Sequence, residues 1–210
     1  MPARRGIVIA AAVLACACAP ALATQVSETR PAQDEPRVDY SGLYAQGITF
    51  AEFLRQVHAR RDEWRQHYND ATVSPELITR MRALPEKRRI LAVAADYCLD
   101  SANTIPYIAR LVDGAPERLS LRMLDPTQGQ PIMDAHRTPD GRDATPTLVM
   151  LDERGRPIGA WVERPSTTQT WFLEQQKVMM QKPLHDQLET WYASDAGRTT
   201  VAEIADILSR

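Results

Sequence analysis

Apolar and polar positions between residues 88 and 162 change their spacing several times. The stretch "RRILAVAADYC" is a continuous apolar run of strand length, which is typical of a strand covered on both faces. "SANTIPYIARLVD" then predicts a helix in spite of Pro106, "ERLSLRMLD" alternates as a strand does, and "GQPIMDAHR" suits a short helix. "TPTLVMLDERGRPIGAWV" predicts two strands joined by a turn at Arg154-Gly155. The helix between the first two strands makes them parallel, and the short turn makes the last two antiparallel.

Helical patterns flank this region on both sides. Thr49 and Glu52 form a capping box before an aromatic stripe, which predicts a helix over about 50–68 that packs on a core. Ser74 and Pro75 start a second, short helix. Residues 166–180 predict a closing helix, and two more helices are expected around Leu184–Tyr192 and after Thr199. We therefore expect an α/β core over 88–182, a helical extension over 41–87 and C-terminal helices over 183–210.

The N-terminus has the layout of a secretory signal. Arg4 and Arg5 precede a short apolar run, and Ala21-Leu22-Ala23 follows it, which predicts a signal peptide over 1–23. The run is shorter than the roughly 20 apolar residues of a membrane-spanning helix. In the alternative interpretation, residues 13–16 form a lipobox and Cys16 carries a lipid that anchors the protein to a membrane. Both interpretations predict export. The polar, Pro-containing residues 24–40 are expected to form a flexible leader.

Charge and cysteine content narrow the classes of function. The formal net charge is −2, so we expect no nucleic-acid partner. The sequence has three cysteines, and signal cleavage would leave only Cys98, which excludes an internal disulfide. No Cys/His cluster has the spacing of a metal site, so we expect neither a metal nor another bound cofactor.

Cys98 follows a predicted strand and precedes a predicted helix. Unpaired N–H groups at a helix start favour a thiolate, and the Ser101 hydroxyl is placed to donate a further hydrogen bond to the sulfur. The Asp100 carboxylate would oppose a second negative charge or compete for the same N–H groups. Cys98 therefore has two interpretations that the residues leave open: a reactive thiol, or a small apolar side chain that fills space.

Three features together resemble the thioredoxin-like superfamily over residues 88–182. They are "YCLDS" at the strand–helix junction, Pro106 eight residues after Cys98, and "ATPTLVMLDERGRPIGAW". The first is similar to the WCGDx motif of a family of exported bacterial thioredoxin-like proteins, which implies the bacterial periplasm. The resemblance implies a central mixed sheet flanked by helices, with Cys98 as the attacking cysteine. It also implies a cis-proline at Pro146, and a substrate-binding side formed by Tyr97, Thr145 and Pro146.

The departures from the family pattern define the expected chemistry. Ser101 replaces the second cysteine, Tyr97 replaces a tryptophan, and "ILAVAA" contains no buried acid. With one thiol, Cys98 can form a mixed disulfide with a disulfide- or thiol-containing protein or peptide, and an external thiol such as glutathione must release it. Asp100 and Ser101 would tune this site. Cys98 could also form a sulfenic acid and sense peroxide. The alternative from another class is a redox-inactive module that binds a protein or peptide partner in the same groove.

Overall fold

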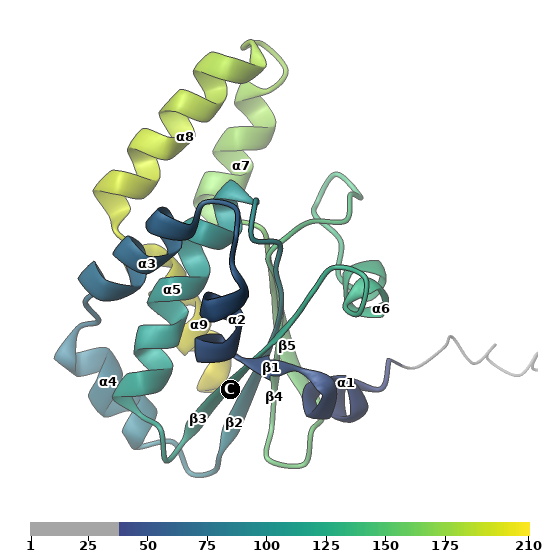
Figure 1. Ribbon diagram of the computed structural model, residues 1–210, viewed down its shortest axis with the longest axis vertical. Coiled ribbons are helices and arrows are strands. Elements are labelled where there is room, and N and C mark those ends of the chain that lie inside the picture. Colours follow the sequence, from purple (N-terminus) through teal and green to yellow (C-terminus); the bar gives the residue numbers. More distant parts are fainter. Residues whose placement is uncertain (1–37) are drawn as a thin grey trace, which may run out of the picture. The chain divides into compact units, whose positions relative to one another are not determined.

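The computed structural model describes residues 38–210. The predicted signal peptide, including Cys16, and nearly all of the predicted leader lie outside the described residues. Helix α1 spans Tyr40–Gln46, so it begins at the last residue of that predicted leader. The remaining elements form the mixed α/β arrangement that the sequence predicts (Figure 1).

Five strands form one mixed sheet in the order β1-β3-β2-β4-β5. The strands are β1 (Ile48–Thr49), β2 (Arg88–Val93), β3 (Leu119–Leu124), β4 (Thr147–Leu151) and β5 (Pro157–Val162). Strands β2 and β3 are parallel, and β4 pairs antiparallel with both β2 and β5, which confirms the two predicted strand relations. The two-residue β1 was not predicted, because a segment this short has no measurable periodicity.

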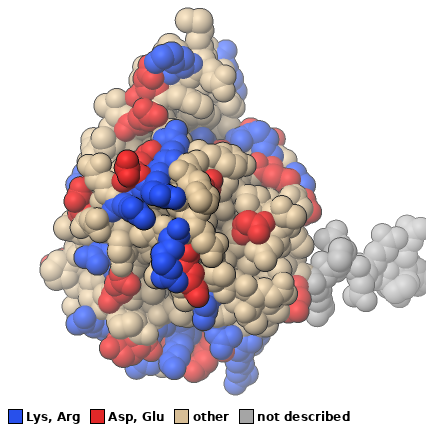
Figure 2. Space-filling model, viewed as in Figure 1, with Lys and Arg blue, Asp and Glu red and all other residues tan. Residues whose placement is uncertain are grey.

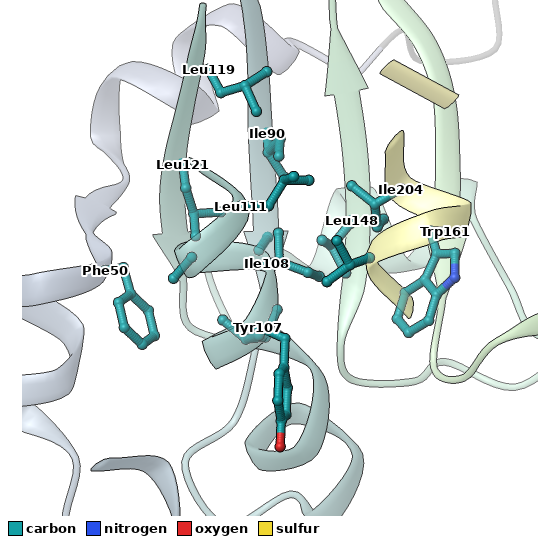
Figure 3. Close-up of a cluster of buried hydrophobic side chains, with 14 of the residues drawn as sticks. Phe50, Ile90, Tyr107, Ile108, Leu111, Leu119, Leu121, Leu148, Trp161 and Ile204 are labelled. Atoms are coloured by element: carbon teal, nitrogen blue, oxygen red, sulfur yellow. The ribbon is translucent and has the colours of Figure 1, made fainter. Parts of the chain in front are cut away.

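Both faces of the sheet are covered, which explains the continuous apolar run of β2. Ile90 and Ala92 belong to one apolar cluster, whereas Leu91 and Val93 belong to the other. The larger cluster lies under α5 (Leu99–Gly114) and α9 (Arg198–Leu208), as Figure 3 shows. The smaller one lies under α1 and α6 (Gln130–Ala135). The alternate side chains of a strand point to opposite faces, so the part of β2 that is packed on both sides, Ile90–Val93, is apolar at every position.

The single helix predicted over 50–68 is wrong, because the structure has two. Helix α2 spans Phe50–Gln56 and α3 spans Arg61–Asp70. Arg60 adopts a left-handed backbone with φ 50°. Asp96 Oδ2 accepts hydrogen bonds from the N–H groups of His58 (2.9 Å) and Ala59 (3.0 Å), which would otherwise continue the helix. The predicted capping box at Thr49 and Glu52 is confirmed.

The last helices extend the fold beyond the sheet. Helix α4 spans Pro75–Arg82 with Ser74 as its N-cap, as predicted. Helices α7 (Ser166–Gln175) and α8 (Gln181–Asp195) pack against each other through an apolar cluster of their own. Gly197 links α8 to α9 with φ +73°, and a side chain there would collide with Tyr107. No helix among residues 38–210 is both long and apolar enough to cross a membrane. Acidic and basic side chains are interspersed on the face in Figure 2.

Candidate functional site

Cys98 lies where the chain turns from β2 into α5. It is the N-cap residue of α5, and its sulfur accepts a hydrogen bond from the Ser101 N–H at 3.5 Å. The thiol donates to the Thr145 carbonyl oxygen at 3.0 Å. The residue is partly exposed. The sulfur therefore lies at the start of a helix, contacts the 145–146 segment and is accessible to solvent.

The segment before β4 borders the sulfur on its other side. The Thr145–Pro146 peptide bond is cis. Pro146 is buried, and its carbonyl accepts a hydrogen bond from the Glu163 N–H at 2.8 Å, which ties the segment to the end of β5. Thr147 Oγ1 donates to the Ala144 carbonyl at 2.7 Å. Thr145 itself stays partly exposed, so its backbone borders both the sulfur and the solvent.

Ser101 contacts the sulfur through its backbone, not through its hydroxyl. The side chain is fully buried, and within residues 38–210 its Oγ has no hydrogen-bond partner. The expected hydroxyl-to-sulfur bond is therefore wrong. The first turn of α5 directs the N–H of residue 101 toward the cap, whereas its side chain packs inward. The residue that replaces a second cysteine thus lies in the interior, close to Cys98.

Asp100 does not compete for the N–H groups at the helix start, because its side chain is buried and ion-paired. Arg164 donates to both of its oxygens, Nε to Oδ1 at 2.9 Å and Nη2 to Oδ2 at 2.8 Å. The Tyr192 hydroxyl donates to Oδ1 at 2.6 Å. Burial raises the pKa of Asp100, while Arg164 and Tyr192 act to lower it. Burial, and then the negative Asp100, raise the pKa of Tyr192 well above its usual value.

Arg164 and Tyr192 were missed by the sequence reasoning. Arg164 also pairs with Glu163 at 3.0 Å and lies over the Phe172 ring at 3.9 Å. A signal for Arg164 was present, because "WVERP" places two adjacent charges where the last strand ends against the core. Tyr192 lies in an amphipathic helical pattern, and nothing in that pattern distinguishes it from an ordinary core residue.

The loop before the cysteine is held by α3. Trp64 Nε1 donates to the Asp96 carbonyl at 2.9 Å, and Arg60 Nε donates to the Tyr97 carbonyl at 3.1 Å. The Tyr97 side chain is 70% exposed beside Cys98. Within the described part of the chain, no three His, Cys, Asp or Glu side chains are grouped as metal ligands.

Comparisons with known proteins assign the family. Curated proteins give no match. Two crystal structures are similar in fold: a protein of unknown function, PA1234, from Pseudomonas aeruginosa, and an HIV epitope-scaffold. The first has 17% identity and a TM-score of 0.64 over 82% of this chain and 98% of the other. The second has 16% identity and a TM-score of 0.63 over 81% and 98%. The family model Thioredoxin_9, described as Thioredoxin, matches residues 47–180, and the chain therefore belongs to this thioredoxin family.

Proposed function

We propose that this protein performs monothiol thiol–disulfide exchange through Cys98. The observation that carries the proposal is the placement of the sulfur. It lies at the N-terminus of a 16-residue helix, is partly exposed, and is 3.0 Å from the Thr145 carbonyl oxygen. A cysteine sulfur is the nucleophile in disulfide exchange, and this one is open to solvent beside a backbone segment that a substrate can pair with.

The exchange takes place in two balanced steps. The Cys98 thiolate attacks one sulfur of a substrate disulfide, forms a mixed disulfide and releases the other sulfur as a thiolate. An external thiol such as glutathione, or a second thiol of the substrate, then attacks the mixed disulfide and regenerates Cys98. Ser101 carries a hydroxyl and cannot make this second attack. The protein needs no bound cofactor, and it catalyses exchange or removal of glutathione from other thiols.

Thr145, Pro146 and Tyr97 would form the substrate-binding side. In the free protein the Thr145 carbonyl accepts a hydrogen bond from the Cys98 thiol. When that thiol loses its proton, the carbonyl becomes free to accept a hydrogen bond from a substrate N–H. Within residues 38–210, the Thr145 N–H donates no hydrogen bond to a protein acceptor. An extended peptide can pair with such a backbone as an added strand does. The exposed ring of Tyr97, the residue before Cys98, offers apolar contact to such a peptide.

The experiment compares the wild type with Cys98→Ser and uses a glutathionylated peptide as substrate. We expect the wild type to form a mixed disulfide that mass spectrometry detects, and glutathione to resolve it. Cys98→Ser should form none. A wild-type thiol that reacts with iodoacetamide and with the substrate no faster than free cysteine would contradict the proposal. Retained peptide affinity in that case would identify the redox-inactive binding module instead.

We also propose that the protein acts after export, in the periplasm. The support is the N-terminal sequence alone: Arg4, Arg5, an apolar run and Ala21-Leu22-Ala23. Mass spectrometry of the mature N-terminus tests this directly. A chain that starts at Thr24 indicates a cleaved signal, a lipid-modified Cys16 indicates a membrane anchor, and an intact Met1 in the cytoplasm would contradict export.

A further inference from the structure

A crevice opens beyond the carboxyl ends of β2 and β3, next to Tyr97. Helix α5 follows β2 and covers one face of the sheet, whereas α6 follows β3 and covers the other (Figure 1). In α/β sheets, ligands bind where successive connections leave toward opposite faces. The crevice has a volume of about 420 Å³ and lies between residues 94–97, residues 125–128 and α2.

The walls of the crevice are apolar and its rim is acidic. The apolar side chains come from β1, α2, the loop after α2 and β3: Ile48, Phe53, Val57, Met123 and Leu124. The charged lining residues are Asp96 and Asp125, and no Lys, Arg or His lines the crevice. Arg60 is the basic side chain that reaches Tyr97. It already donates to the Tyr97 carbonyl and forms an ion pair with Glu63 at 2.7 Å.

Both carboxylates are fixed by backbone N–H groups. Asp125 Oδ1 accepts from Thr127 N at 2.7 Å and from Gln128 N at 3.0 Å. Burial acts to raise the pKa of Asp96, but hydrogen bonds from the backbone of Ala59 and His58 outweigh burial and hold the pKa below its usual value. Two carboxylates held by backbone N–H groups therefore line an otherwise largely apolar crevice.

We propose that this crevice is a substrate subsite that binds a Lys or Arg side chain close to the reactive cysteine of a peptide substrate. The aliphatic stem would contact the apolar walls, and the cationic end would lie between Asp96 and Asp125. This subsite rests on the proposed exchange at Cys98. Neighbouring strands lie about 4.8 Å apart and an extended peptide advances about 3.3 Å per residue. Strands β4, β2 and β3 are successive neighbours, and the crevice is lined by the residues just before Cys98 and by the end of β3, so a peptide that crosses from Thr145 over Cys98 reaches the crevice about one to three residues from its own cysteine.

The test uses short peptides whose cysteine is a mixed disulfide with thionitrobenzoate. Lys, Glu or norleucine is placed in turn at one, two or three residues on either side of that cysteine. Attack by Cys98 transfers the peptide to the protein and releases the coloured thionitrobenzoate anion, so one disulfide breaks as another forms. Rates with free glutathione normalise the intrinsic reactivity of each peptide. The variant is Asp96→Asn/Asp125→Asn, in which the amide oxygens still accept the backbone hydrogen bonds. The matched control is Glu117→Gln/Glu153→Gln, which removes two exposed charges at the opposite end of the sheet.

We expect the best Lys peptide to react about tenfold faster than its Glu counterpart with the wild type, as two exposed ion pairs allow. The ratio should fall to about two in the double Asn variant, stay unchanged in the control, and decrease with added salt. Equal wild-type rates for Lys and Glu peptides would overturn the subsite while leaving exchange intact. A Lys-to-Glu rate ratio that stays at its wild-type value in the double Asn variant would do the same. No peptide reacting above the glutathione baseline would instead overturn the exchange itself. If the double variant does not fold, Asp125→Asn alone and the salt dependence of the wild type decide the question.

Discussion

Arg164→Met tests the buried ion pair between Arg164 and Asp100, which lies in the first turn of the helix that begins after Cys98. The guanidinium binds both oxygens of Asp100, and the two side chains are only 6% and 8% exposed. Methionine retains an apolar stem near Phe172 but leaves the carboxylate without its cation. Glu163 keeps Arg142 and Gln169 as partners, so the change acts mainly on Asp100. Removing one partner of a buried pair typically costs about 3–5 kcal/mol.

The size of the loss depends on pH because Asp100 can take up a proton. Burial already raises its pKa, and loss of Arg164 removes a charge that lowers it, so the pKa rises further. In the unfolded chain an aspartate titrates near pH ~3.9, and each pH unit above that adds about 1.36 kcal/mol to the cost of holding the proton. The cost of keeping Asp100 protonated in the folded variant therefore cannot exceed about 4 kcal/mol at pH 7 and about 1.5 kcal/mol at pH 5. The folded state binds more protons than the unfolded state in this range, so stability falls as the pH rises.

Urea unfolding at pH 5 and pH 7, followed by tryptophan fluorescence, measures both losses. Arg164→Met should lose about 3–4 kcal/mol at pH 7 and clearly less at pH 5. The double change Asp100→Asn/Arg164→Met should recover most of the neutral-pH loss, because no carboxyl group remains to be protonated. Equal losses at the two pH values, or a double variant no more stable than Arg164→Met, would refute the assignment of the loss to an unpaired Asp100.

Three further changes examine neighbouring features. Ser101→Cys, made in the chain that begins at Thr24, should form an intramolecular disulfide with Cys98 and accelerate the reduction of insulin by dithiothreitol, because the two residues lie one helical turn apart; a count of two free thiols under oxidising conditions would speak against this. Tyr192→Phe should lose about 1.5–3 kcal/mol in urea unfolding, since it removes a hydrogen bond to a carboxylate; an unchanged stability would mean that the 2.6 Å contact contributes nothing. Gly197→Ala should lose about 1–3 kcal/mol by calorimetry, because φ is positive and Tyr107 occupies the space; no change in melting temperature would exclude strain at this turn.

Strands β2 to β5 and helix α5 could be predicted from the sequence because their signals are local. Continuous apolar residues mark β2 and β4, alternation marks β3, and the turn at Gly155 separates β4 from β5. Each pattern reflects which faces of a strand are covered, because covered positions are mostly apolar whichever element covers them. The parallel relation of β2 and β3 and the antiparallel relation of β4 and β5 then follow from their connections, whereas the order of the strands and the antiparallel pairing of β4 with β2 were not predicted.

The break at Arg60 and the pairing of Asp100 could not be predicted, because each depends on a residue distant in sequence. Residues 50–68 carry a helical pattern throughout, and the helix ends early because Asp96 binds the free N–H groups of the intervening loop. Asp100 looked like a charge that opposes a thiolate, and the structure gives it Arg164 and Tyr192 as partners. Both outcomes are tertiary contacts that override local preference.

The C-terminal helices are part of the site and not an accessory to it. The family match ends at residue 180, yet Tyr192 of α8 supplies one of the hydrogen bonds that hold Asp100 in the first turn of the cysteine helix. Helix α9 adds fully buried Ile204 and Leu208 to the main core. Its Glu203 accepts from Trp161 Nε1 at 2.7 Å and from Ser166 N at 2.9 Å, so it also fixes the segment that contains Arg164. Residues beyond the matched region therefore complete both the core and the hydrogen bonds of Asp100, two residues after Cys98.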